Sequence, residues 1–198
     1  MNEGAITLFR VRGVPVRMHW SLPVIALLVG GFRFAPGVWI AWILVLLVHE
    51  LGHAFWVVRY RMRLTDVFVH GAGGHCDWNG SASPWQRCII AWGGIMGQAI
   101  AFAIAWGTIQ FVPITSTFVA DFVYVLTWNN LFLAAINLIP LEPLDGVRAW
   151  KIIPLIRQRA WRSDHRASAA APKKRAGRPN LKVIEGGAND DDKPRWLN

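Results

Sequence analysis

Three long apolar blocks constrain this chain more than any other feature of its sequence. They run over Pro36–Val58, Cys88–Val112 and Phe118–Ile139, and each reaches the roughly 20 residues that a helix needs to cross a bilayer. A shorter block, Trp20–Phe34, is interrupted by two glycines and an arginine. With 54% hydrophobic residues, the chain is too apolar for an ordinary soluble domain. We therefore predict an all-α polytopic membrane protein with about four transmembrane helices.

The basic residues indicate how these spans are oriented. Arginines precede the short block Trp20–Phe34 at positions 10, 12 and 17, and follow the block Pro36–Val58 at positions 59, 61 and 63. Thirteen Lys and Arg residues lie between Arg148 and Arg195. Short cytoplasmic loops are enriched in Lys and Arg, so we predict that both termini and the loop after Pro36–Val58 are cytoplasmic.

The basic C-terminal region is interpreted as a tail. The formal net charge of +9 suits anionic lipid, and no nucleic-acid-reading motif accompanies it, so we expect the lipid bilayer and no nucleic acid as a partner. Ser168–Asn198 is rich in Ala, Pro, Gly, Lys and Asp, a composition typical of disorder. We predict a membrane domain over residues 1–160 and a disordered cytoplasmic tail over residues 161–198.

The block Pro36–Val58 contains the motif His49-Glu50-Leu51-Gly52-His53. Residues four apart share one helix face, so both imidazoles can bind one metal, with Glu50 beside them to take a proton from the attacking water. Ionisable residues inside a span cost about 2.5–3.5 kcal/mol each on insertion scales, which favours a metal partner over a chance occurrence. Counting back from Arg59 puts His53 about 9 Å and His49 about 15 Å deep. The motif predicts one catalytic Zn²⁺ per chain, because zinc takes His and carboxylate ligands.

A third ligand is expected late in the chain. Glu142 and Asp145 follow the last apolar block, where Pro140 and Pro143 break the helix. Unwound backbone at membrane depth is tolerated where it lines a protein cavity. Chemistry alone leaves Glu142 and Asp145 as alternatives.

Two short segments around Gly71–Gly74 predict a β-hairpin, because the glycines supply the turn. His70, His75, Cys76 and Asp77 lie in this region, but their spacing fits no strong metal motif. We interpret them as a polar loop.

Together these features resemble the site-2 protease family of intramembrane zinc metalloproteases. His49–His53 matches the family's H-E-x-x-H, and Asn137–Gly146 matches its N-x-x-P-x-x-x-L-D-G element. Gly13–Ser21 resembles the opening segment of bacterial members, and Gly93–Gln98 falls where the family has its G-P-x-x-N motif. This resemblance implies a bacterial inner-membrane location and nominates Asp145 as the third zinc ligand.

The resemblance also implies a substrate-binding shell. Asn137 would hold substrate or stabilise the transition state, although an amide there equally fits a helix-end hydrogen bond. Gln98 stands where the family has asparagine and could still donate hydrogen bonds to a substrate. The hairpin would be re-entrant and pair with substrate as an added strand, which assigns Gly73 and Gly74 to substrate binding.

The sequence thus favours an intramembrane zinc metalloendopeptidase that cuts in or near the transmembrane segment of a single-span membrane protein, as in regulated intramembrane proteolysis. The alternative is a non-proteolytic relative that binds transmembrane helices, but a pure binder has no need of Glu50 as a base. A zinc transporter is disfavoured, because no chain of ionisable residues crosses the membrane.

Overall fold

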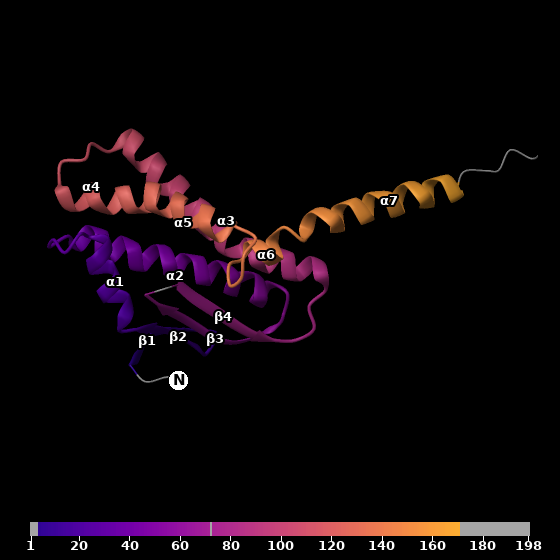
Figure 1. Ribbon diagram of the computed structural model, residues 1–198, viewed down its shortest axis with the longest axis horizontal. Coiled ribbons are helices and arrows are strands. Elements are labelled where there is room, and N and C mark those ends of the chain that lie inside the picture. Colours follow the sequence, from indigo (N-terminus) through magenta and orange to yellow (C-terminus); the bar gives the residue numbers. More distant parts are fainter. Residues whose placement is uncertain (1–3, 72, 171–198) are drawn as a thin grey trace, which may run out of the picture. The chain divides into compact units, whose positions relative to one another are not determined.

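A computed structural model describes residues 4–71 and 73–170 (Figure 1). The chain divides into two units, Met1–Arg159 and Ala160–Asn198. In order along the chain, the elements are β1 (Ala5–Val11), β2 (Val14–His19), α1 (Ser21–Val29), α2 (Pro36–Arg59), β3 (Arg63–His70), β4 (Gly73–Asn79), α3 (Pro84–Phe111), α4 (Thr117–Tyr124), the π-helix η1 (Val125–Asn129), α5 (Asn130–Asn137), α6 (Gly146–Ala149) and α7 (Ile152–Ala170).

Three helical stretches in the described residues are long and apolar enough to cross a membrane. They are α2, α3 and the continuous run from Thr117 to Asn137 formed by α4, η1 and α5. The predicted multi-pass membrane protein is confirmed at this level. Helix α3 begins where the sequence offers a capping box, in which the Ser83 hydroxyl accepts from the Gln86 N–H and the Gln86 side chain accepts from the Ser83 N–H.

The first predicted span has a different structure. Trp20–Phe34 holds only α1, whose nine residues are too few for a transmembrane helix. The residues before it form the β1–β2 hairpin, which the sequence analysis did not predict. Its turn residues Arg12 and Gly13 both have positive φ, as a two-residue hairpin turn of type I′ requires.

The predicted hairpin is one half of a larger, four-stranded mixed sheet of order β1-β2-β3-β4. β3 and β4 pair antiparallel, with His70 opposite Gly73, whereas β2 and β3 pair parallel, with Val16 opposite Val67. The fold is therefore mostly helical with a small mixed sheet, and the all-α prediction is wrong to that extent.

The sheet packs on α2, and Figure 1 shows its strands running beneath that helix. Val16 and Val67 are fully buried in one hydrophobic cluster with Val57 of α2. A second cluster joins Leu22 of α1 to Leu46 of α2. Close packing of these apolar side chains holds the sheet against the helix.

Helices α2 and α3 approach closely at a pair of glycines. A Cβ on Gly93 would lie 2.6 Å from the Gly52 carbonyl oxygen, so neither residue has space for a side chain. Small residues at such positions let membrane helices pack backbone to backbone. This contact brings α3 against the motif at 49–53.

Residues 161–170 continue helix α7, whereas the sequence analysis assigned them to a disordered tail. This stretch is rich in Ala and Arg, which are strong helix formers, and that local preference outweighs its low hydrophobicity. The rest of the predicted tail, 171–198, lies outside the described residues. The domain boundary at residue 160 stays a prediction.

Candidate metal centre

Three side chains converge at one point in the membrane domain. His49 and His53 lie one turn apart on α2, and Asp145 lies at the start of α6. The two Nε2 atoms are 3.1 Å apart, and Asp145 Oδ2 is 3.0 Å from each of them. Both histidines are buried, so three ligand atoms meet in a site largely shielded from solvent. The group is able to hold a metal ion.

The outer nitrogen of each histidine is held by a neighbour on α3. His49 Nδ1 lies 3.0 Å from Gln98 Oε1, and His53 Nδ1 lies 2.7 Å from the carbonyl oxygen of Ile90. Both partners are oxygen acceptors, so each Nδ1 carries the hydrogen and each Nε2 presents a lone pair. Second partners of this kind fix the tautomer and the ring orientation of metal-binding histidines.

This geometry changes the interpretation of Gln98. The sequence predicts a substrate-binding residue, but the side chain is 1% exposed and lies beneath His49. Asn130 donates from Nδ2 to the Gln98 carbonyl oxygen at 2.8 Å and to that of Leu126 at 3.1 Å, which links α3 to the third span. Gln98 is placed to orient His49, a candidate metal ligand. The predicted contact between Gln98 and substrate is untested.

The loop that carries Asp145 is fixed by two tryptophans. Trp150 donates from Nε1 to the Leu138 carbonyl at 2.6 Å, and Trp92 of α3 donates to the Ala149 carbonyl at 3.1 Å. The two indoles also meet edge to face, with centroids 5.9 Å apart. These contacts hold α6, and with it Asp145, against α3 and the end of α5.

Charge at the site favours an ionised Asp145. Burial raises the pKa of this carboxyl group, but hydrogen bonds and positive charge from His49 and His53 lower it more when their imidazoles are protonated in the absence of metal. The net pKa lies below the ordinary value for aspartate, so the carboxylate is available as a ligand at neutral pH.

Glu50 occupies the space between α2 and the sheet. It is 4% exposed, and a Cβ on Gly74 of β4 would lie 2.5 Å from Glu50 Oε1. Gly74 thus gives Glu50 room, and β4 comes directly against the candidate base. Gly73 and Gly74 belong to this end of β4, whereas the sequence predicted them in the turn of the hairpin.

Two other candidates lie apart from this group. Glu142 is exposed, and it is Asp145 that joins the two histidines. Asn137 is the last residue of α5 and half-buried, and within 4–71 and 73–170 its side chain makes no hydrogen bond, so its predicted role is untested.

A second acidic and imidazole cluster lies on the sheet. Asp66, His75 and Asp77 have ligand atoms within 4.8 Å of one another, and they belong to paired strands β3 and β4 instead of a polar loop. Asp66 forms a two-point ion pair with Arg17 of β2, with Nε to Oδ1 at 3.0 Å. Arg17 supplies the counter-charge that a cation would otherwise provide.

Sequence reasoning missed two parts of the centre, the Ile90 carbonyl and the tryptophan clamp on Asp145, and it did not place Gly94 against the imidazoles. A backbone carbonyl leaves no trace in the residue type. The hydrogen bonds of Trp92 and Trp150 depend on how α6 packs against α3 and the end of α5. Gly94 belonged to a recognised glycine-rich segment, so its presence was a signal, but its contact with both imidazoles depends on helix packing.

Comparison with known proteins agrees with this geometry. No family model matches the sequence. The chain is 25% identical over 160 residues to zinc metalloprotease MJ0392 of Methanocaldococcus jannaschii, covering 75% of this chain and 45% of that protein. It is 30% identical over 184 residues to Rip3 of Mycobacterium tuberculosis, provisionally named a zinc metalloprotease, covering 80% of this chain and 44% of Rip3. The chain thus spans less than half the length of these relatives.

The fold is shared with a solved protein. The structure of a site-2 protease from Methanocaldococcus jannaschii superposes with a TM-score of 0.61 at 23% identity, covering 75% of this chain and 71% of that one. That likeness establishes the fold, and the sequence relationships connect the same chain to zinc metalloproteases. Fold and sequence together make this chain similar to a solved site-2 protease and to zinc metalloproteases.

Proposed function

We propose that this chain is an intramembrane zinc metalloprotease that hydrolyses peptide bonds in or near transmembrane segments of membrane proteins. The observation that carries the proposal is the convergence of His49, His53 and Asp145 within 3.0–3.1 Å, with Glu50 buried on the same helix. A helix that is apolar enough to span a membrane has little other reason to contain such a group.

The donor set fits zinc. The hydrogens on the two Nδ1 atoms are directed to Gln98 and the Ile90 carbonyl, so three lone-pair atoms face one another at about hydrogen-bond distance. A cation among these three atoms would relieve the repulsion between their lone pairs. Two imidazoles and one carboxylate, with a further position left open, form a common set of ligands for catalytic zinc. The names of the two relatives support the same metal.

Hydrolysis follows from the positions of these groups. Zn²⁺ held there would polarise the scissile carbonyl and lower the pKa of water. Glu50 takes a proton from the attacking water as the water oxygen bonds to the carbonyl carbon of the substrate. Glu50 then gives that proton to the departing nitrogen as the C–N bond breaks, so the atoms and charges balance. The buried setting of Glu50 keeps competing bulk water away from the proton.

The sheet offers a means of holding the substrate extended. In the sheet order β1-β2-β3-β4, strand β4 is an edge, and its Gly74 lies against Glu50. A helical substrate must unwind before attack, and pairing with a strand edge supplies hydrogen bonds to the unwound backbone. We assign Gly73 and Gly74 to this contact and propose that β3 and β4 are re-entrant, because they pack on α2 at the depth of the metal site.

We propose that the N-terminal segment makes a fourth crossing, which would leave both termini on one side, the cytoplasmic side that the basic residues predict. Val16 shares a cluster with Val57, Leu22 shares one with Leu46, and Gly30 lies against the Trp39 indole. Strand β2 and helix α1 therefore run antiparallel to α2 over 18 of its residues, or about 27 Å. Strand and helix together make the crossing for which the sequence predicts one helix. We propose the bacterial inner membrane as the location of this multi-pass protein, as the sequence resemblance implies.

Replacing Glu50 tests the proposal. In purified full-length protein, Glu50→Gln is expected to keep the zinc content of wild type and to lower cleavage of single-span test substrates at least about 100-fold, because the amide cannot accept the proton. Metal analysis and gel-based cleavage of a broad substrate panel measure the two effects. Glu142→Gln is the matched control, since that carboxylate is exposed and outside the ligand group, and it should change neither quantity.

A wild-type protein that cuts nothing the Glu50→Gln variant leaves intact would refute the protease proposal. If both proteins instead retain a transmembrane substrate with equal affinity and cut none, the chain is the non-proteolytic helix binder. Cleavage of membrane-bound regulators, as in regulated intramembrane proteolysis, is the cellular role that this chemistry would serve.

A second prediction concerns Gln98 as a positioning residue. Gln98→Leu removes the acceptor for His49 Nδ1, so zinc affinity measured by competition with a chelator should fall about 10–100-fold. Gln98→Glu keeps an acceptor at the same length and should restore most of the affinity. A variant with normal zinc affinity but a raised KM would instead establish the substrate-binding role that the sequence predicts.

A further inference from the structure

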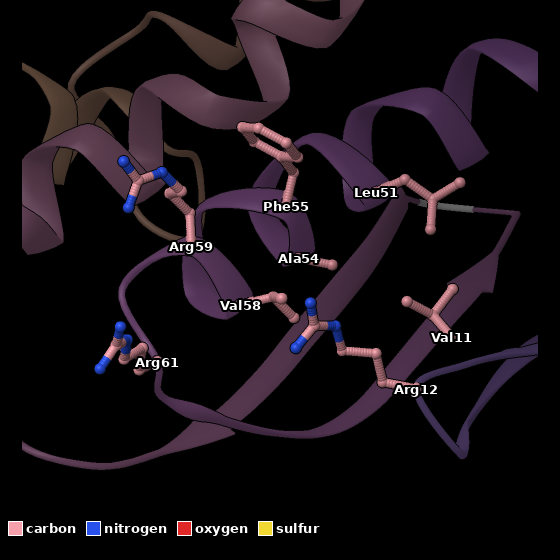
Figure 2. A pocket seen from close by; sticks show the side chains of 8 residues that line it. All are labelled: Val11, Arg12, Leu51, Ala54, Phe55, Val58, Arg59 and Arg61. Atoms are coloured by element: carbon pink, nitrogen blue, oxygen red, sulfur yellow. The ribbon is translucent and has the colours of Figure 1, made fainter.

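A pocket of about 600 Å³ lies between the β1–β2 turn and the C-terminal half of α2 (Figure 2). Its apolar lining includes Val11, Leu51 and Phe55, and its basic lining is Arg12, Arg59 and Arg61. These residues come from the hairpin turn, from α2 and from the turn that follows α2. The metal centre uses none of them.

The three arginines present unneutralised charge to this pocket. Within residues 4–71 and 73–170, none of the three forms an ion pair, whereas Arg17 is paired with Asp66. All three are exposed. Arg12 and Arg61 have φ of 51° and 58°, a left-handed conformation that is uncommon for arginine. Three like charges around one pocket favour an anionic ligand.

The lining of the pocket is more basic at the end of α2 and more apolar farther back along that helix. Figure 2 shows Arg59 and Arg61 at one end, Val11 and Leu51 at the other, and Arg12 between them. Leu51 lies eight residues before Arg59 on α2, which is about 12 Å along the helix. Phe55, between the two, is 61% exposed and extends the apolar lining toward the surrounding lipid.

This layout matches a phospholipid in a bilayer. Arg59 is the last residue of α2, so it lies at the membrane interface if α2 crosses the membrane, and Leu51 lies within the hydrocarbon. Guanidinium groups bind phosphate in charge-assisted hydrogen bonds. Inorganic phosphate would leave the apolar end of the pocket unused, and a phosphatidylcholine headgroup would bring a cation to the arginines.

We propose that this pocket binds an anionic phospholipid, with its phosphate on Arg12, Arg59 and Arg61 and one acyl chain along Phe55 and Leu51. The bound lipid joins the β1–β2 turn to the end of α2. It would thereby hold the sheet against the helix that carries the metal ligands. The site depends on α2 crossing the membrane and is independent of proteolysis.

Native mass spectrometry of the full-length protein in neutral detergent tests the site. Phosphatidylglycerol and phosphatidylcholine with identical acyl chains are added separately, and retained lipid is counted. Wild type is expected to retain one phosphatidylglycerol in preference to phosphatidylcholine. Arg12→Gln and Arg61→Gln should each weaken this binding about fivefold, and the double variant about 25-fold.

Arg63→Gln is the matched control, because Arg63 is exposed on β3 and does not line the pocket. It should leave retention unchanged, and thermal unfolding in detergent should show that every variant is folded. Equal weakening by Arg63→Gln would show diffuse surface charge and overturn the proposal. Displacement of the lipid by excess inorganic phosphate would also overturn it, as would undiminished retention in the double variant.

Discussion

Gly94→Ala is expected to abolish zinc binding while leaving the membrane domain folded. A Cβ at this position would lie 2.6 Å from both His49 Cε1 and His53 Nε2, which is closer than real Cβ atoms approach other heavy atoms. Neither ring can turn aside without breaking its hydrogen bond to the Gln98 side chain or to the Ile90 carbonyl. The added methyl group therefore displaces both ligands, and without the metal the proposed cleavage should fall below detection.

Zinc content of the purified variant measures this effect, and the same helix provides a control. A Cβ on Gly107, also in α3, would meet nothing within 4 Å, so Gly107→Ala should keep full zinc occupancy. Alanine is also the better helix former, so this control should be as stable as wild type or slightly more so. Full zinc occupancy in Gly94→Ala would show that the metal lies elsewhere.

Three candidate membrane spans and the grouping of the first two candidate ligands could be predicted from sequence, because both signals are local. Pro36–Arg59 is apolar enough to identify by composition alone, and the spacing of His49 and His53 fixes a common helix face. Asp145 required a motif, since two carboxylates were chemically equal until the fold brought one of them to the imidazoles.

The parts that escaped prediction depend on contacts between distant segments. The direction of Gln98 is set by how α3 packs on α2, and no periodicity in α3 reveals that its amide lies under His49. The β1–β2 hairpin was not predicted because its strands carry arginines. These were interpreted as cytoplasmic residues that precede a first transmembrane helix. Its parallel pairing with β3 joins residues about 50 apart in sequence, a non-local contact that no single segment encodes.

Gly52→Ala is expected to have the largest effect on the fold. A Cβ on Gly52 would lie 2.8 Å from the carbonyl carbon of Gly93 and closer still to its oxygen. These are backbone atoms of the facing helix, so they cannot turn aside as the end of a side chain can. The two helices must separate, and overpacking of this kind costs about 1–3 kcal/mol or more.

The same separation should also reach the metal centre. His53 follows Gly52 directly, and its Nδ1 partner is the Ile90 carbonyl on the opposite helix. Gly52→Ala should therefore lower both the thermal unfolding temperature in detergent and the zinc content, whereas Gly94→Ala lowers the zinc content with little loss of stability. Gly107→Ala again serves as the control. A Gly52→Ala variant as stable as wild type would show that α2 and α3 do not meet at these glycines. It would also contradict the position of Gln98 beneath His49, because that position depends on the same contact between the helices.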